Sequence, residues 1–307
     1  MDYDGYFFQF GGFFLPKLPK IATVVSSRAC PFHCTFCPKL FPEWRYRVRS
    51  AENIFQEILV LNSQGYEIIF FQDENFSHDV ERLETFCNLV LEHKLKMRFA
   101  FQGTIHHLSA STFQLMHKAG FDLLFVGIES GSNAQLSRYK KPSTNESLST
   151  AIYHAKKAHM LVMGFFIHGG PGETLADSKL TDKFIREVKP HVAGTTELHI
   201  HFGTKLWNEF VGTSEPQSID ASLSKKFSLI SDQHSKNYLK ACEKSFEKAL
   251  SRSWLHWRRA YEVIDLVVFN RSVQKIFMQF EMNFNWLFQL FKGGPIRKKP
   301  SKRASTS

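Results

Sequence analysis

Several features of membrane and secreted proteins are missing from this 307-residue sequence. No apolar run approaches the length of a membrane-spanning helix, so we do not expect one. The first residues, Met1 to Asp4, carry no positive charge, and this argues against a signal peptide. There are only five cysteines, an odd number, so a disulfide framework is not expected. These absences favour a cytoplasmic protein whose thiols stay reduced.

Acidic residues are absent from the end of the chain, between Lys292 and Ser307, where six basic residues occur. Without those six charges, the formal net charge of +10 falls to +4. The basic character is therefore largely a property of this tail, which we expect to be disordered. The hydrophobic fraction of 43% and charged fraction of 22% are typical of a globular domain. A nucleic-acid partner is not favoured, although the tail keeps an RNA-modifying enzyme as an alternative.

Strand-like runs and amphipathic helical stretches alternate through the first two thirds of the chain. We expect strands at residues 21–26, 67–71, 97–101, 122–127, 161–167 and 196–202. Helix-start signals stand between them, at Ser50, at Ser77 or Asp79, at Ser109 and at Asn145. Alternation of this kind predicts βαβ units with right-handed connections, and hence an α/β fold built on a parallel sheet.

The pattern divides the chain into four parts. Residues 1–20 are rich in Phe, Gly and Pro and form an extended lead-in, while the α/β region covers residues 21–207. Residues 208–291 form a helical C-terminal region, followed by the tail at 292–307. The helical region either covers the α/β domain or lies, through its last helix, on an anionic membrane surface. That helix carries apolar side chains before the basic tail: Phe284, Trp286, Leu287, Phe288, Leu290 and Phe291.

Three cysteines, Cys30, Cys34 and Cys37, follow the first predicted strand with C-x₃-C-x₂-C spacing. Thiolates this close in sequence can converge on one metal centre, and three of them leave one iron of a four-iron cluster without a protein ligand. A structural zinc site, with His33 or a distant residue as fourth ligand, is the alternative. However, no second cysteine pair follows at a suitable distance. The other cysteines, Cys87 and Cys242, lie among apolar residues and are expected to be buried.

The cysteine spacing, with Phe36 directly before the third cysteine, resembles the cluster motif of radical S-adenosylmethionine (SAM) enzymes. The resemblance implies an open (β/α)₆ partial TIM barrel, and the six predicted strands match that count. It also implies a [4Fe–4S] cluster on Cys30, Cys34 and Cys37 whose open iron binds SAM. Reductive cleavage of SAM would then give a 5′-deoxyadenosyl radical that abstracts hydrogen from a substrate.

Further segments match the same family at the ends of predicted strands. The run from Ile69 to Phe76, with Asp73 and Glu74, resembles an I-x-F-x-D-D-x-F motif whose acidic residues would lie beside the SAM amino group. A G-x-E-S-G-S segment supplies Glu129 and Ser130. There the resemblance implies that the glutamate accepts hydrogen bonds from the ribose. Twelve residues after Glu129 stands Lys141, which could neutralise a carboxylate.

The region from Gly164 to Thr174 resembles a G-x-x-G-x-P-G-E-T loop, in which Gly169 and Gly170 would pack on the adenine. A closing segment, 201–207, has Phe202 where the family has proline, so its turn geometry departs from the pattern. His106 and His107 are interpreted as core or rim residues. His199 and His201 would share one face of the sixth strand and could face the substrate.

Relatives with these segments often carry an N-terminal cobalamin-binding domain with a D-x-H-x-x-G loop. The residues before the first predicted strand contain no such histidine, so cobalamin-dependent methylation is not supported by this chain alone. The chain is then either a standalone form or a fragment of a longer enzyme. A non-catalytic cluster- or zinc-binding protein is the remaining alternative. We expect a small-molecule substrate, for methylation or rearrangement, and a low-potential electron donor such as ferredoxin or flavodoxin.

Overall fold

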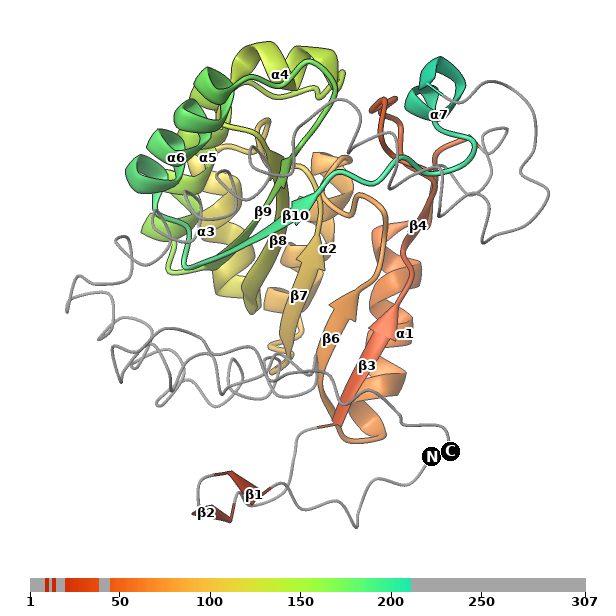
Figure 1. Cartoon of the computed structure of the whole chain (residues 1–307). Coiled ribbons are helices and arrows are strands. Elements are labelled where there is room, and N and C mark those ends of the chain that lie inside the picture. The colour runs from red at the N-terminus through yellow and green to blue at the C-terminus, as the bar shows by residue number, and fades with distance from the viewer. Residues whose placement is uncertain (1–8, 11–12, 15–19, 39–44, 211–307) are drawn as a thin grey trace, which may run out of the picture.

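The computed structural model describes residues 9–10, 13–14, 20–38 and 45–210. Its centre is a six-stranded sheet in the order β10-β9-β8-β7-β6-β3, so each strand lies next to its predecessor in the chain (Figure 1). All neighbouring strands are parallel. The strands are β3 (Lys20–Val24), β6 (Tyr66–Phe71), β7 (Arg98–Gln102), β8 (Phe121–Glu129), β9 (Leu161–His168) and β10 (Val192–Glu197). The predicted α/β class with a parallel sheet is confirmed.

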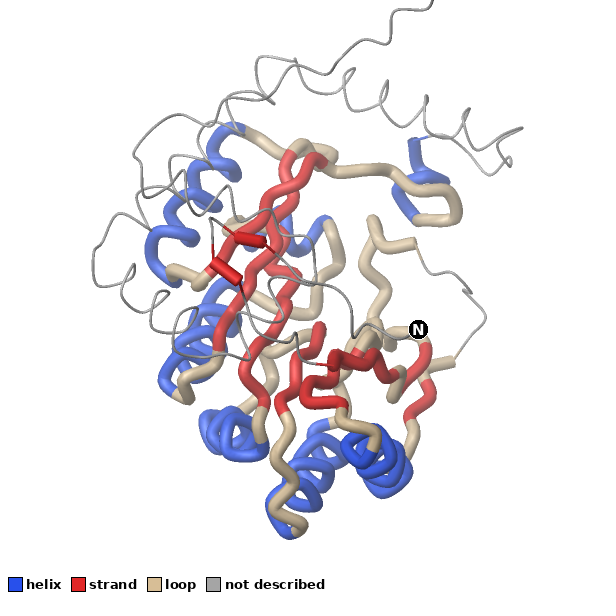
Figure 2. Tube along the Cα trace, turned by 90° about the horizontal axis from the view of Figure 1, so that it is seen from below, coloured by secondary structure: helices blue, strands red, loops and turns tan. Residues whose placement is uncertain are grey.

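Helices connect successive strands and cover the outer face of the curved sheet, and the other face is concave (Figure 2). This is the arrangement of an open barrel. The helices are α1 (Ala51–Ser63), α2 (Val80–Glu92), α3 (Ala110–Ala119), α4 (Asn133–Arg138), α5 (Asn145–Lys157), α6 (Leu175–Val188) and α7 (Lys205–Phe210).

The helices begin at the residues that sequence signals indicate, with one shift. The hydroxyl of Ser50 accepts a hydrogen bond from the third residue of α1, and Ser109 does the same for α3. Of the two candidates before α2, Asp79 is the cap. The cap of α5 is Thr144, one residue before the expected Asn145, because Thr144 and the third helical residue form a reciprocal capping box.

Phenylalanine fills the space between the sheet and the helices. Phe71 of β6 stacks on Phe76, with ring centroids 4.2 Å apart, and meets Phe86 of α2 edge-on. These rings are almost fully buried, which explains much of the unusual Phe content. Cys87 is buried beside them, as predicted, and Cys242 lies outside the described residues.

The sixth strand was predicted incorrectly. It runs from Val192 to Glu197, not over 196–202, and its last residue pairs with His168 of β9. Gly194 made this stretch look unlike a strand. A Cβ at that position would lie 3.2 Å from the ring of Phe165, so glycine makes room for a large neighbour. His199 and His201 therefore follow the strand and do not share one of its faces.

Two short antiparallel pairs were not predicted. β1 (Gln9–Phe10) pairs with β2 (Phe13–Phe14) in the lead-in, and β4 (Ser27–Arg28) pairs with β5 (Arg47–Val48) beside the cysteines. The expected boundary at 207/208 falls within α7, and the domain limits stay predictions. The predictions for the tail and for the helical region beyond Phe210 concern residues outside the described ranges. No helix in the described part of the chain is long and apolar enough to cross a membrane.

Candidate functional site

The cysteine loop and the other predicted site segments follow the carboxyl ends of neighbouring parallel strands. The loop comes after β3, the Asp73 segment after β6, the Glu129 segment ends β8, and the Gly169 segment ends β9. Parallel strands bring these ends to one edge of the sheet, where sites gather in such folds. The predicted residues therefore stand at the same end of the open barrel.

The cysteine loop is held by its backbone. Thr35, between the second and third cysteines, donates its N–H to the carbonyl of Tyr139 at 2.9 Å. Its own carbonyl accepts a hydrogen bond from the N–H of Leu206 in α7 at 3.1 Å. The ring of Phe36 packs edge-on against Tyr139, with centroids 5.1 Å apart. Phe36, expected beside the cofactor, thus contacts Tyr139.

The three thiols lie on one short loop and influence one another electrostatically. Burial raises the pKa of the Cys34 thiol, a rise that nearby Lys141 opposes and Cys30 increases. Cys37 is exposed, but desolvation by the protein around it raises the pKa of its thiol to about 11, and both other cysteines contribute. In addition, the side-chain amide of Asn75 donates to Cys30 Sγ at 4.0 Å.

This donor set fits a four-iron cluster. Each thiolate of such a cluster binds a different iron, so the sulfurs need only be neighbours. Among the described residues, no three His, Cys, Asp or Glu side chains are arranged to hold a single metal ion. His33, the fourth ligand in the zinc alternative, is exposed. The pKa values of Cys34 and Cys37 are raised, so metal binding has to release protons from these two thiols.

Asp73 is buried and holds the segment that leads into the cysteines. Its carboxylate accepts hydrogen bonds from the N–H of Ser26 at 2.7 Å, from the Ser26 hydroxyl at 2.6 Å and from the N–H of Ser27. Arg82 of α2 donates to the Ser26 carbonyl at 3.1 Å. Both oxygens of Asp73 are occupied within the protein, so the geometry favours a positioning role over contact with SAM. Glu74, the next residue, is exposed.

Glu129 and Lys141 form a buried ion pair, with Lys141 Nζ 3.0 Å from Glu129 Oε1. Burial alone would lower the pKa of Lys141, but the Glu129 carboxylate and Cys34 raise it, so the ammonium stays charged. Gly127 makes the pair possible, because a Cβ there would lie 2.3 Å from Glu129 Oε1. Glu129 itself has a positive φ of 67°, which turns its side chain at the end of β8.

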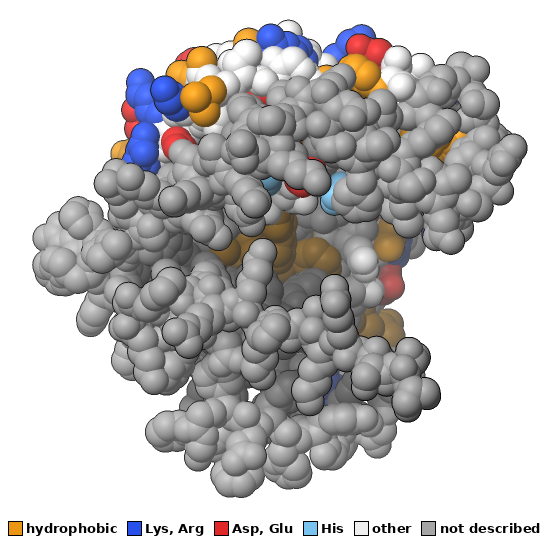
Figure 3. Space-filling view, in the orientation of Figure 1, with side chains coloured by type: hydrophobic (Ala, Val, Ile, Leu, Met, Phe, Trp, Pro, Cys, Tyr) orange, Lys and Arg blue, Asp and Glu red, His pale blue; other side chains and the backbone are white. Residues whose placement is uncertain are grey.

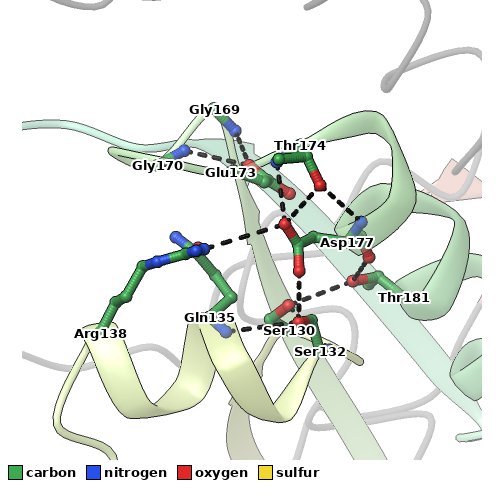
Figure 4. Close-up of polar contacts among 10 residues, drawn as sticks. All are labelled: Ser130, Ser132, Gln135, Arg138, Gly169, Gly170, Glu173, Thr174, Asp177 and Thr181. Atoms are coloured by element: carbon green, nitrogen blue, oxygen red, sulfur yellow. Dashed lines mark hydrogen bonds and ion pairs between the residues drawn. The ribbon is translucent and has the colours of Figure 1, made fainter.

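Ser130 belongs to a polar network that joins the end of β8 to α6 (Figure 4). Its hydroxyl lies 3.2 Å from the hydroxyl of Thr181 and accepts the N–H of Ser132. The hydroxyl of Ser132 in turn donates to Asp177 Oδ1 at 2.5 Å. Ser130 is fully buried, so its contacts here are internal and position the Glu129 segment.

The loop after β9 is tightly closed. The N–H groups of Gly169 and Gly170 donate to the same oxygen of Glu173, at 2.5 and 3.0 Å (Figure 4). Burial raises the pKa of Glu173 to about 7, although these two N–H groups oppose the rise. A Cβ on Gly170 would lie 1.9 Å from Tyr139 Oη. Sequence reasoning missed the structural roles of Glu173 and Tyr139, because both depend on contacts between segments.

The histidines after β7 lie near the rim. His107 Nε2 is 2.8 Å from the carbonyl of Ser77, and the ring of His106 is 6.3 Å from that of Phe32, between the first two cysteines. Burial lowers the pKa of His106 to about 4, so it is neutral at physiological pH. The interpretation of this pair as rim residues is consistent with these contacts.

The chain is similar to several curated enzymes. It is 28% identical over 186 residues to an uncharacterized methyltransferase from Pyrococcus horikoshii, a match that covers 60% of this chain and 40% of the relative. The cytidylyl-2-hydroxyethylphosphonate methyltransferase of Streptomyces wedmorensis is 27% identical, with 55% and 33% covered. The anaerobic magnesium-protoporphyrin IX monomethyl ester cyclase of Rubrivivax gelatinosus is 26% identical, with 59% and 33% covered. The chain thus spans less than half of the length of these relatives.

Two solved structures share the fold. The SAM methyltransferase TsrM from Kitasatospora setae, with cobalamin and a [4Fe–4S] cluster bound, matches 62% of this chain and 39% of its own with a TM-score of 0.57 at 17% identity. The cobalamin-dependent SAM radical enzyme OxsB, with aqua-cobalamin bound, gives 0.50 at 22% identity and matches 69% of this chain and 31% of its own. These likenesses confirm the predicted partial barrel.

A family model decides the assignment. The model of the radical SAM superfamily matches residues 24–185, more than half of the chain, and this stretch includes all three cysteines, Glu129 and Glu173. Members of this family are enzymes that use a [4Fe–4S] cluster and SAM. The chain belongs to the radical SAM superfamily, and what it shares with its cobalamin-dependent relatives is their radical SAM part.

Proposed function

We propose that this chain cleaves SAM reductively and uses the resulting radical to take a hydrogen atom from a small-molecule substrate. The observation that carries the proposal is the position of the thiols of Cys30, Cys34 and Cys37. They lie on one braced loop beside the buried Glu129–Lys141 pair. A cluster ligand set and a charged, sheltered pair at one barrel end suit a positively charged, ribose-containing cofactor.

Cys30, Cys34 and Cys37 would hold the cluster, and Glu129, Glu74 and the Gly169–Gly170 backbone would contact SAM. A cluster held there would supply the one electron needed to cleave SAM to methionine and a 5′-deoxyadenosyl radical, which would become 5′-deoxyadenosine by taking hydrogen from the substrate. The electron comes from a low-potential donor such as flavodoxin or ferredoxin. Asp73 and Ser130 act by positioning the two segments.

The buried ion pair has a defined part in this scheme. Lys141 balances the charge of Glu129 at an almost fully buried position. A carboxylate accepts hydrogen bonds from hydroxyl groups. Glu129 is therefore suited to bind the ribose diol, and Lys141 to hold its side chain in place.

The test is anaerobic reconstitution of the chain with iron and sulfide, followed by incubation with SAM and dithionite. We expect about three to four irons per chain and release of 5′-deoxyadenosine, measured by chromatography and mass spectrometry. Cys37→Ser should lose both. Cys87→Ala is the matched control, since Cys87 lies in the hydrophobic core away from the loop. A reconstituted chain that binds zinc but no iron, or that leaves SAM intact, would refute the proposal.

Methyl transfer with cobalamin is a second candidate, favoured by the names of the relatives. The Pyrococcus and Streptomyces proteins are named as methyltransferases, and TsrM was solved with cobalamin bound. The experiment is titration of the reconstituted chain with hydroxocobalamin, followed by its absorption spectrum. Saturable binding would support this candidate. No spectral change up to millimolar cobalamin would argue against it for the chain by itself.

A further inference from the structure

The concave face of the sheet carries a cluster of apolar side chains that the proposed function does not use. It includes residues from all six strands that point away from the helices: Ile21, Ile68, Phe70, Ala100, Leu123, Phe125, Leu161, Met163 and Val192. Figure 3 shows apolar side chains of the described residues on this side of the molecule, with histidine and acidic side chains above them.

Three aromatic rings, which we call the aromatic shelf, form the upper part of this face: Phe70, Phe125 and Phe165. The rings of Phe125 and Phe165 are nearly parallel, at 8°, with centroids 6.2 Å apart. Phe70 meets Phe125 edge-on at 5.5 Å. Phe165 is 39% exposed in the intact chain, whereas the next residue, Phe166 on the helix side, is fully buried. A large apolar side chain is thus left accessible inside the barrel.

Glycines in the neighbouring strands flank Phe165 on both sides. It pairs with Gly127 of β8 and with Gly194 of β10. A Cβ on Gly194 would lie 3.2 Å from the Phe165 ring, so a larger residue there would crowd the ring. Neither register partner places a Cβ beside the ring, and 39% of Phe165 is exposed.

The shelf adjoins the residues proposed to bind SAM. Gly127, the register partner of Phe165, is the same glycine that makes room for the Glu129–Lys141 pair. A Cβ on it would lie 3.4 Å from Lys141 Nζ. A group resting on Phe165 therefore lies next to the proposed cofactor, where a hydrogen donor has to be.

Two pairs of oppositely charged side chains on or next to these strands form ion pairs. Arg98 of β7 is paired with Asp122 of β8, and Glu129 with Lys141. The amide of Gln102 donates to the carbonyl of Asp73 at 2.8 Å. These groups therefore offer little to an ionic substrate. Parallel and edge-on aromatic contacts favour a planar apolar one.

We infer that the aromatic shelf binds a flat, uncharged ring of the substrate by stacking on Phe165. The inference rests on the proposed function, because it places that ring beside SAM. It narrows the substrate class to molecules with a planar apolar group at or near the carbon that loses hydrogen. Of the rings in the shelf, Phe165 has the largest exposed fraction and is the direct contact.

The experiment measures indole binding to the reconstituted chain with SAM, by saturation-transfer NMR and titration. We expect Phe165→Ala to weaken binding about tenfold, and Phe165→Leu to weaken it less, because stacking is lost but apolar area remains. Tyr153→Ala is the matched control. Tyr153 is a 58% exposed aromatic residue on α5, which covers the outer face, and its loss should leave indole affinity unchanged.

Three outcomes would overturn the inference. Equal indole affinity in Phe165→Ala and the wild type would show that the shelf is not the contact. Failure of the wild type to bind indole would mean that protein fills the shelf. Tighter binding of benzoate than of indole would assign the face to anions. Release of 5′-deoxyadenosine is scored separately, so loss of SAM cleavage would reject the proposed function while indole binding still tests the shelf.

Discussion

The carboxylate of Asp73 shows how a single residue fixes the approach to the cysteines. Its two oxygens accept two backbone N–H groups and a hydroxyl from Ser26 and Ser27, and it is only 1% exposed. The motif pointed to an acidic residue here, but only the tertiary contacts show that it faces Ser26. Asn75, which lies beside Cys30, belongs to the same motif and could have been selected from it.

We predict that Asp73→Asn destabilises the protein by about 1–3 kcal/mol, because the amide must turn a donor toward groups that need an acceptor. The cysteine segment then loses its anchor, and the chain should retain less iron after reconstitution. Thermal unfolding and iron content per chain measure both effects. Glu92→Gln, an exposed change in the last turn of α2, is the control. Full iron content in Asp73→Asn with an unchanged unfolding temperature would contradict the positioning role.

Glu173 should give the protein a distinct pH dependence. Burial raises its pKa from 4.5 to about 7, so the folded state holds this proton more tightly than the unfolded state. Its contribution to stability is present below pH 4.5 and is lost as the pH rises to about 7. The loss is at most about 3 kcal/mol, at 1.36 kcal/mol per pKa unit.

The side chain in Glu173→Gln cannot ionise. We therefore expect the unfolding temperature of this variant, measured relative to the wild type, to rise between pH 5 and pH 8. Differential scanning calorimetry at several pH values provides the comparison. Glu187→Gln, on the exposed side of α6, should follow the wild-type curve. Parallel curves for Glu173→Gln and the wild type would show that this carboxyl titrates normally.

At the scale of elements, the positions of helices and strands were predicted best where local sequence signals and burial agree. Strands β6 to β9 are runs of β-branched and aromatic residues between turns, and their positions were predicted to within two residues. The range of β10 was predicted wrongly because glycine has a low propensity for strands. Gly194 occurs there because it leaves room for the ring of Phe165. The six residues of α4 are too few to show a helical period, so only Ser132, its cap, could have signalled it.

The end of α3 offers a test of backbone geometry. Gly120 closes the helix with φ +104°, and a Cβ there would lie 2.3 Å from the carbonyl of Met97. Gly65 also has a positive φ, +82°, but nothing lies within 4 Å of its Cβ position. Gly65→Ala should therefore cost only about 1 kcal/mol of backbone strain.

We expect Gly120→Ala to cost clearly more, about 3 kcal/mol, since strain and a backbone clash add. Chemical denaturation of both variants gives the two free energies of unfolding. Equal costs would mean that the contact with Met97 relaxes easily, and that the approach of β7 to α3 is less tight than the structure indicates.

At the scale of the whole molecule, the two sides of the barrel mouth meet at the cysteine loop. Trp207 of α7 is 1% exposed and packs in a small apolar cluster with Tyr139, Ile167, Leu198 and Leu206, and Phe36 lies against this cluster. None of these contacts follows from local periodicity, because the segments lie far apart in the chain. The sequence resemblance placed 201–207 near the site, but not its packing on the cysteine loop.

We predict that Trp207→Ala loosens this loop and speeds the loss of a reconstituted cluster in air. Truncating a buried tryptophan costs about 3–5 kcal/mol of folding stability, and here the lost contacts all belong to one local cluster. The decay of the cluster's visible absorption gives the rate. Leu180→Ala, at a 47% exposed position on α6, should decay like the wild type. Identical decay rates in all three proteins would show that α7 does not protect the cluster.

The backbone bonds of Thr35 also bear on how the protein is made. Thr35 leaves the ribosome early in translation, whereas its partners Tyr139 and Leu206 emerge much later. A nascent chain that stops short of Leu206 carries all three thiols but lacks one of the two backbone bonds that hold them in place. Iron delivery during translation would meet an unfinished ligand loop, so maturation of this protein is expected to follow completion of its sixth strand and α7.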